Sequence, residues 1–218
     1  MTASRERLRW RGAIAIVAVA AAAMIVGACA NPSNSNDGGG GNGSGTDEQE
    51  TYEVGDTGPA NGIIFYDDEA DGTDDIDGAR YLEAAPDSTE WDVKWGDEGT
   101  EIDGNAQLTG IGDGQAATDA VVAHMESEGI TGTAAQRADG LSQGGYEDWF
   151  LPSEDELDLM YDNEGDIGGF SALNEYWASS ESTGGFSANF AKAQSFGNGS
   201  KVKSSKSIEH RVRAIRAF

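Results

Sequence analysis

A single cysteine, at position 29, limits how this 218-residue chain can be stabilised. One cysteine cannot form a disulfide framework or a CxxC motif, and it leaves no thiol for catalysis in the region that follows. The folded part must therefore be held together by a hydrophobic core, with or without a bound metal ion.

Cys29 ends a segment that is typical of an export signal. Residues 5–11 contain four arginines, residues 13–26 are apolar, and residues 26–29 read VGAC. The apolar run is shorter than the ~20 residues of a comfortable membrane span, so a secretory signal is favoured. The VGAC segment resembles the lipobox of bacterial lipoproteins, which implies that residues 1–28 are removed and that Cys29 is lipidated. An ordinary signal peptide or a simple membrane anchor remains the alternative.

Two further regions follow the signal. Residues 29–50 are rich in glycine, asparagine, serine and acidic residues, which predicts a flexible tether. Residues 51–218 are expected to form one domain. The predicted location is outside the cytoplasm, lipid-anchored to the cell membrane or the cell surface, with the anchor as the only membrane contact.

Charge is distributed unevenly along the chain. It has 39 acidic and 14 basic residues, a formal net charge of -25. Such an acidic body repels nucleic acid and anionic lipid, so neither is expected as a partner. Half of the basic residues fall near the C-terminus, where they could neutralise their own scaffold or face a ligand: Lys192, Lys201, Lys203, Lys206, Arg211, Arg213 and Arg216.

Local patterns predict short strands at residues 63–66 and 80–85 and helices at 115–128 and 134–141. A capping box formed by Ser153 and Glu156 should start a third helix that ends near residue 163. Four side chains around this helix are expected to be buried: Trp149, Leu151, Leu157 and Tyr161. Most aromatic residues are expected in the core rather than in carbohydrate stacking, namely Trp91, Trp95, Tyr146, Trp149, Phe150, Tyr176 and Trp177.

The last segment, residues 176–218, has strand-like ends and a middle without a sustained period. Residues 176–180 and 212–218 resemble strands, whereas residues 182–210 are mainly serine, glycine, asparagine and lysine with a few aromatics. Such a composition favours a displayed surface rather than a buried one.

Five motifs together resemble one family. They are GPANGIIFY (58–66), RYLEAAP (80–86), GGYEDWFLPS (144–153), YWASSE (176–181) and RVRAIR (211–216). The family is the bacterial surface domain found at the C-terminus of collagen-like adhesins and in many lipoproteins, related to the C-type lectin and formylglycine-generating-enzyme superfamily. The resemblance implies an α+β, C-type-lectin-like fold: a small twisted antiparallel sheet with paired N- and C-terminal strands, two main helices and long loops.

The resemblance also carries a functional expectation. Some family members look like targets of diversity-generating retroelements, which randomise asparagine codons, and residues 182–190 contain only residue types that such changes can reach. The chain is expected to be a ligand-binding adhesin or receptor-like lipoprotein whose partner is a protein or glycan on another cell or on a phage. The alternative is a structural envelope lipoprotein without a specific ligand site. The predicted ligand-binding residues are Ser182, Thr183, Phe186, Lys192, Ser195, Ser200, Lys201, Val202, Lys203, Ser204, Ser205, Ser207, Ile208 and His210.

Catalysis and cofactors are not expected. The chain has two histidines and no GxSxG or HExxH motif, so an enzyme is not predicted. Residues 67–78 form an acidic loop whose oxygen ligands suit calcium, but the position of the EF-hand glutamate is Gly78. A solvated acidic loop is the favoured interpretation, and calcium there is the alternative. The Glu-Pro-Asn motif of calcium-dependent sugar binding is also missing from the sequence.

Overall fold

The computed structural model describes residues 50–218, apart from residues 73–74, 77, 103 and 185–186. The described chain contains two β-sheets and five α-helices, which confirms the predicted α+β class. The export signal, most of the tether and the predicted lipidation site Cys29 lie outside the described residues.

The smaller sheet joins the two ends of the domain. Its order is β1-β2-β8, with β1 at Ile63–Asp67, β2 at Tyr81–Ala84 and β8 at Ile215–Ala217. Both pairings are antiparallel. The expected direct pairing of the first and last strands is therefore wrong, because β2 lies between them.

The larger sheet contains five strands in the order β3-β7-β4-β5-β6. Only β4 and β7 pair in parallel, and the other neighbours are antiparallel. A single small sheet was expected, so the second sheet is a correction. The strands are β3 (Trp91–Lys94), β4 (Glu175–Glu181), β5 (Phe190–Ser195), β6 (Lys201–Ser205) and β7 (Glu209–Val212).

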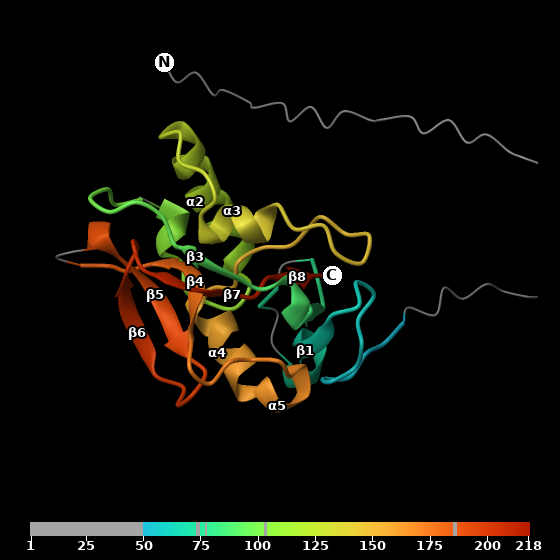
Figure 1. Ribbon diagram of the computed structural model, residues 1–218. Coiled ribbons are helices and arrows are strands. Elements are labelled where there is room, and N and C mark those ends of the chain that lie inside the picture. The colour runs from blue at the N-terminus through green and yellow to red at the C-terminus, as the bar shows by residue number, and fades with distance from the viewer. Residues whose placement is uncertain (1–49, 73–74, 77, 103, 185–186) are drawn as a thin grey trace, which may run out of the picture. The chain divides into compact units, whose positions relative to one another are not determined.

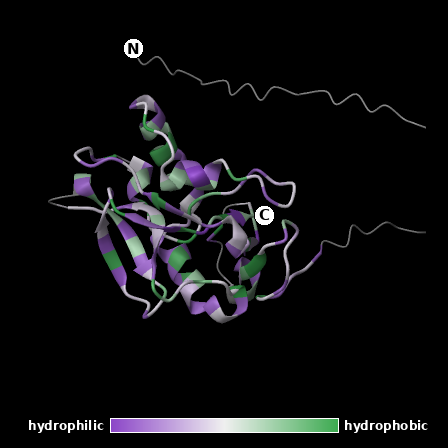
Figure 2. Ribbon diagram, viewed as in Figure 1, coloured by the Kyte–Doolittle hydropathy of each residue, from purple (hydrophilic) through white to green (hydrophobic). Residues whose placement is uncertain are grey.

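The two hairpin strands β5 and β6 replace much of the segment predicted to lack regular structure. Their alternation is weak in sequence because one face of β5 carries only small apolar residues, Ala191 and Ala193, which are buried. The opposite face carries long polar side chains such as Lys192 and Gln194. Figure 2 shows a clearer alternation along β6, where Val202 lies between two lysines.

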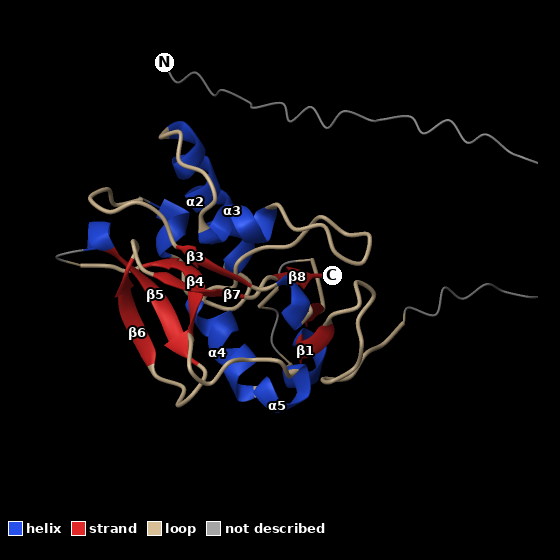
Figure 3. Cartoon of the chain, in the orientation of Figure 1, coloured by secondary structure: helices blue, strands red, loops and turns tan. Residues whose placement is uncertain are grey.

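Helices cover both faces of the larger sheet (Figure 3). The three predicted helices are confirmed within one or two residues at most ends, and the shorter α1 and α5 were not predicted. The helices are α1 (Asp68–Asp71), α2 (Gly114–Ser127), α3 (Ala134–Asp139), α4 (Glu154–Asp162) and α5 (Glu164–Ile167), with single 3-10 turns at Asp87–Thr89, Gly104–Gln107 and Ser187–Asn189.

Strand β4 separates two hydrophobic cores. Its Trp177 packs into the core that contains α2 and α3, whereas Tyr176 and Ala178 pack into the core that contains α4 and the smaller sheet. This division follows from the two-residue period of a strand, which sends successive side chains to opposite faces.

The region before α4 folds as predicted. Trp149, Leu151 and Leu157 are buried, whereas Tyr161 is only half-buried, with its ring 5.6 Å from that of Phe196. The capping box is also confirmed. Its serine hydroxyl accepts the Glu156 N–H (3.2 Å), and the glutamate carboxylate accepts the Ser153 N–H (2.7 Å). Among the aromatics predicted to be core, Trp91 is half-buried and Tyr146 is 36% exposed; the other five are buried.

Candidate ligand-binding surface

The β5–β6 hairpin forms one edge of the larger sheet. Figure 1 places it on the side of the domain away from the point where the described chain begins. That beginning lies beside the C-terminus, since the rings of Tyr52 and Phe218 are 5.8 Å apart. The hairpin is thus the part of the domain that projects away from the entry of the chain.

Lysines on one face of the hairpin pair with acids of α4. Lys192 lies 2.7 Å from Glu154, and Lys201 lies 2.9 Å from Asp158 and 3.4 Å from Asp155. Burial lowers the pKa of Lys201, but the two aspartates raise it by more, so its net pKa is above the usual value. These ion pairs hold the hairpin against α4.

The other basic residues of the C-terminal segment are similarly engaged. Arg211 and Arg213 both bind Glu90, at 2.6 and 2.5 Å. Within the described chain, six of the seven basic residues after position 182 pair with carboxylates of the scaffold, and Lys203 donates instead to the Thr183 carbonyl (3.2 Å). This geometry favours neutralisation of the scaffold over attraction of an acidic ligand.

A buried ion pair anchors the turn that follows β6. Lys206 and Glu181 have fully buried side chains and contact each other directly. The lysine also donates to the Thr100 carbonyl (2.9 Å) and lies 4.9 Å from the centre of the Trp95 ring. Burial raises the pKa of Glu181, although the lysine and the Ile102 N–H act in the opposite direction.

The serines of this turn have a further partner that sequence reasoning did not identify. Glu98 accepts hydrogen bonds from Ser205 and Ser207, the latter at 2.9 Å. The hydrogen bond from Ser205, followed by that from Ser207, lowers the pKa of Glu98. No local pattern links positions 98 and 205, so the contact arises only from the fold.

His210 of β7 reaches the other face of the hairpin, where it contacts Ser204 of β6. His210 Nε2 is 2.6 Å from Ser204 Oγ and 3.1 Å from Glu175, and its ring is 4.4 Å from that of Trp177. Burial lowers the pKa of His210, and Glu175 partly offsets this. Serine and carboxylate approach the same nitrogen, whereas a hydrolytic triad uses both ring nitrogens. The arrangement is a polar contact that orients the imidazole.

The structure sorts the predicted ligand-binding residues by exposure. Ser182 is only 2% exposed and its N–H donates to the Phe190 carbonyl (3.0 Å), so its assignment to the exposed surface is wrong. Phe186 lies outside the described residues. The exposed members are Thr183, Ser200, Lys201, Lys203, Ser207 and Ile208, and the half-buried members are Lys192, Ser195, Val202, Ser204, Ser205 and His210.

The acidic loop is used partly for internal contacts. Asp67 binds Arg80 at 2.8 Å, and the buried Asp68 accepts the Asp75 N–H at 3.0 Å. The hydrogen bond from Arg80 lowers the pKa of Asp67. In the described part of the chain, no three His, Cys, Asp or Glu residues are grouped so that they could hold a metal ion. Three loop positions, 73, 74 and 77, lie outside that part, and calcium stays a hypothesis.

No family model matches the chain, and the search of curated proteins gave no match. Across residues 50–218, excluding the gaps, none of the helices has both the length and the apolar character needed to cross a membrane.

Proposed function

We propose that this protein is a lipid-anchored surface lipoprotein that binds a protein or glycan ligand through the β5–β6 hairpin and the turn after it. The proposal includes a C-type-lectin-like scaffold, lipidation of Cys29 and the absence of enzymatic activity. The observation that carries it is the contrast in this segment between side chains that are buried or paired with scaffold acids and side chains that are exposed at the surface.

The fixed side chains hold the hairpin in one position. Lys192 and Lys201 contact α4, and Lys206 is buried in its pair with Glu181. Ser200, Ser207 and the 48%-exposed Ile208 lie beside them at the surface, where substitutions have small effects on packing, and Ser207 also donates to Glu98. A rigid framework with tolerant surface positions is the arrangement that separates stability from specificity.

The position of the hairpin supports the same proposal. It projects away from residue 50, where the described chain begins, and so lies apart from the point at which the chain enters the domain. Since most of the lysines are already paired, ligand contact relies on neutral polar groups and on Ile208. Binding should therefore depend only weakly on salt.

The test is to replace four exposed residues together, Ser200, Lys203, Ser207 and Ile208, by alanine. The melting temperature should stay near that of the native protein, while binding to whole cells or envelope extracts should change. A matched control replaces the 97%-exposed Leu173, which lies outside the hairpin, by alanine. Unchanged binding by the fourfold variant would place the site elsewhere, and unfolding would show that these positions are structural.

The structural alternative is favoured by a separate observation, the pairing of six basic residues of the segment with scaffold carboxylates. Sequences from close strains discriminate the two functions. Variation concentrated at the exposed positions of 182–210, with a nearby reverse transcriptase and an imperfect repeat, supports a diversified binding surface. Evenly spread divergence supports a structural role.

A further inference from the structure

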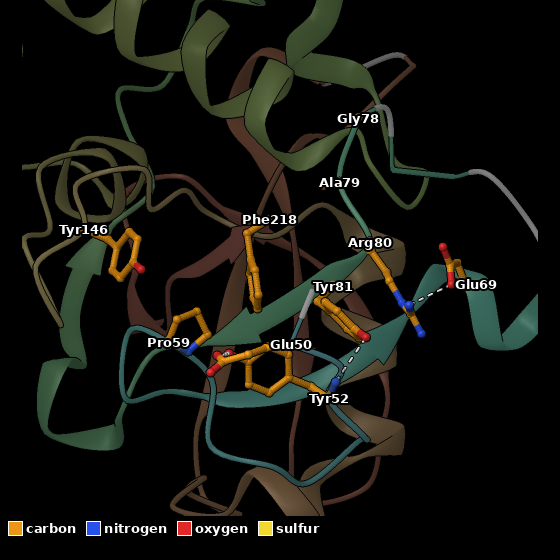
Figure 4. Close-up of a pocket in the computed structure, with 10 residues that line it drawn as sticks. All are labelled: Glu50, Tyr52, Pro59, Glu69, Gly78, Ala79, Arg80, Tyr81, Tyr146 and Phe218. Carbon is orange, nitrogen blue, oxygen red and sulfur yellow. Dashed lines mark hydrogen bonds and ion pairs between the residues drawn. The ribbon is translucent and has the colours of Figure 1, made fainter. Parts of the chain in front are cut away.

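A hollow of about 470 Å³ is lined by residues from both ends of the described chain, Tyr52 near its start and Phe218 at its end. Figure 1 shows these two ends away from the β5–β6 hairpin. Aromatic and proline rings from separate parts of the chain converge on it: Tyr52, Pro59, Tyr146 and Phe218 (Figure 4). Tyr146 is one of the few large hydrophobic side chains of the described chain that are exposed. This site is distinct from the proposed hairpin surface and does not depend on it.

An ionic network, buried at Arg216 and Glu83 and half-exposed at Asp148, holds the walls of the hollow. Arg216 forms two hydrogen bonds of 2.9 Å with Asp148 and lies 3.2 Å from Glu83. Its guanidinium carbon is 4.0 Å from the centre of the Tyr146 ring and 4.8 Å from that of Phe218. One cation thus positions two of the rings.

The same network fixes the loop that carries Pro59. The Glu83 carboxylate accepts the N–H groups of Ala60 (3.1 Å) and Gly62 (2.7 Å). Gly144, at a φ of +64°, packs directly against Ala60, where a Cβ atom would collide with the backbone. The loops at 58–62 and 143–148 are therefore locked to each other.

Stability alone does not explain such a network. Burying an arginine and a glutamate costs desolvation energy, and well-packed apolar residues often stabilise a fold equally well. What this arrangement achieves is to hold aromatic rings rigidly at the surface. Rings that are ordered before binding reduce the entropy lost when a ligand stacks on them.

The charges around the hollow disfavour both cationic and anionic ligands. Arg216 already lies over two rings, so a cationic ligand on those rings would meet an adjacent positive charge. Glu50 and Glu69 line the rim and repel an anion, and Arg80 is already bound to Asp67 and Glu69. What suits these groups is an uncharged ligand with an apolar face and many hydroxyl groups.

We propose that this hollow is a saccharide-binding site. A sugar ring stacks on Tyr146 and Phe218 through its C–H face, and its hydroxyl groups bond to the carboxylates of the rim. The tether is a poor occupant because residues 30–49 contain no aromatic or large apolar side chain.

The experiment titrates the full chain with chitohexaose, cellohexaose and mannohexaose, and separately with tetramethylammonium and inorganic phosphate, by calorimetry. At least one saccharide should bind with a Kd below about 10 mM. Tyr146→Ala should weaken it at least about tenfold, equivalent to about 1.4 kcal/mol, whereas Tyr146→Phe should keep most of the affinity. Because Tyr146 is exposed, melting temperatures should confirm that both variants fold.

Arg216→Lys tests the positioning role, because lysine keeps the charge but not the planar fork that binds Asp148. The affinity of Arg216→Lys for the saccharide should fall, whereas the affinity of Tyr146→Phe should stay near that of the native protein. Leu173→Ala, at an exposed position outside both sites, should leave saccharide binding unchanged. Loss of saccharide binding in Ile208→Ala, in the turn after β6, would instead assign that binding to the surface of the proposed function. The proposal is overturned if no saccharide binds at about 10 mM, if binding survives Tyr146→Ala, or if tetramethylammonium or phosphate binds more tightly than every saccharide.

Discussion

Replacement of Lys206 by methionine tests how the turn after β6 is held. Methionine keeps the length and the packing against Trp95 but removes the ammonium group that neutralises Glu181. The carboxylate is then left in a fully buried position without its cation, although the Ile102 N–H at 2.9 Å and the side chain of Gln107 still donate to it. Breaking one partner of a buried ion pair usually costs about 3–5 kcal/mol, so we expect a loss of that size in the free energy of unfolding at pH 8.

The loss should depend on pH in a defined direction. Burial raises the pKa of Glu181 in the folded protein above its unfolded value, so the native state takes up a proton more readily than the unfolded state. Removing Lys206 removes an interaction that lowers this pKa. Stability of the Lys206→Met variant should therefore fall more steeply than that of the native protein as pH rises from the unfolded pKa of Glu181 towards pH 8.

Urea denaturation at several pH values provides the measurement. The matched control is Lys201→Met, which breaks a half-exposed pair with Asp158 and should cost less than about 1 kcal/mol. A second variant, Lys206→Met combined with Glu181→Gln, should recover part of the loss because no buried charge remains. Equal effects of Lys206→Met and Lys201→Met would contradict the buried pair.

Three further predictions concern the capping box, a buried carboxyl and the anchor. Ser153→Ala should lower the free energy of unfolding by about 1 kcal/mol in urea denaturation, because α4 loses the hydroxyl that accepts the Glu156 N–H; an unchanged value would show that the cap is dispensable. Burial raises the pKa of Glu156 to about 7 from its ordinary value of 4.5. The protonated Glu156 therefore contributes to stability most fully below pH 4.5, and this contribution is lost as pH rises through 7. Glu156→Gln should remove this part of the pH dependence of the free energy of unfolding. Parallel plots of that free energy against pH for the variant and the native protein would argue against it. Cys29→Ala should shift the protein from the membrane fraction to the soluble fraction, and the native protein should carry a lipid by mass spectrometry; a membrane-bound variant together with a lipid-free native protein would exclude the anchor.

Local signals in the sequence were sufficient for several elements of the fold. The start of α4 was predictable because a capping box involves residues only three positions apart. Strand β1 and helices α2 and α3 were predictable because apolar periodicity is also local. Strands β5 and β6 were not, since the buried face of β5 consists of alanines whose hydrophobic signal is weak.

The two candidate sites depend on contacts between distant positions. Ser205 meets Glu98, and Lys206 meets Glu181, without any sequence pattern that relates them. The aromatic hollow combines rings from both ends of the domain, and Arg216 positions them through acids at 83 and 148. The sequence showed which residue types could bind a ligand. Their exposure and their partners could be found only from the folded structure, because burial and charge pairing depend on neighbours in space.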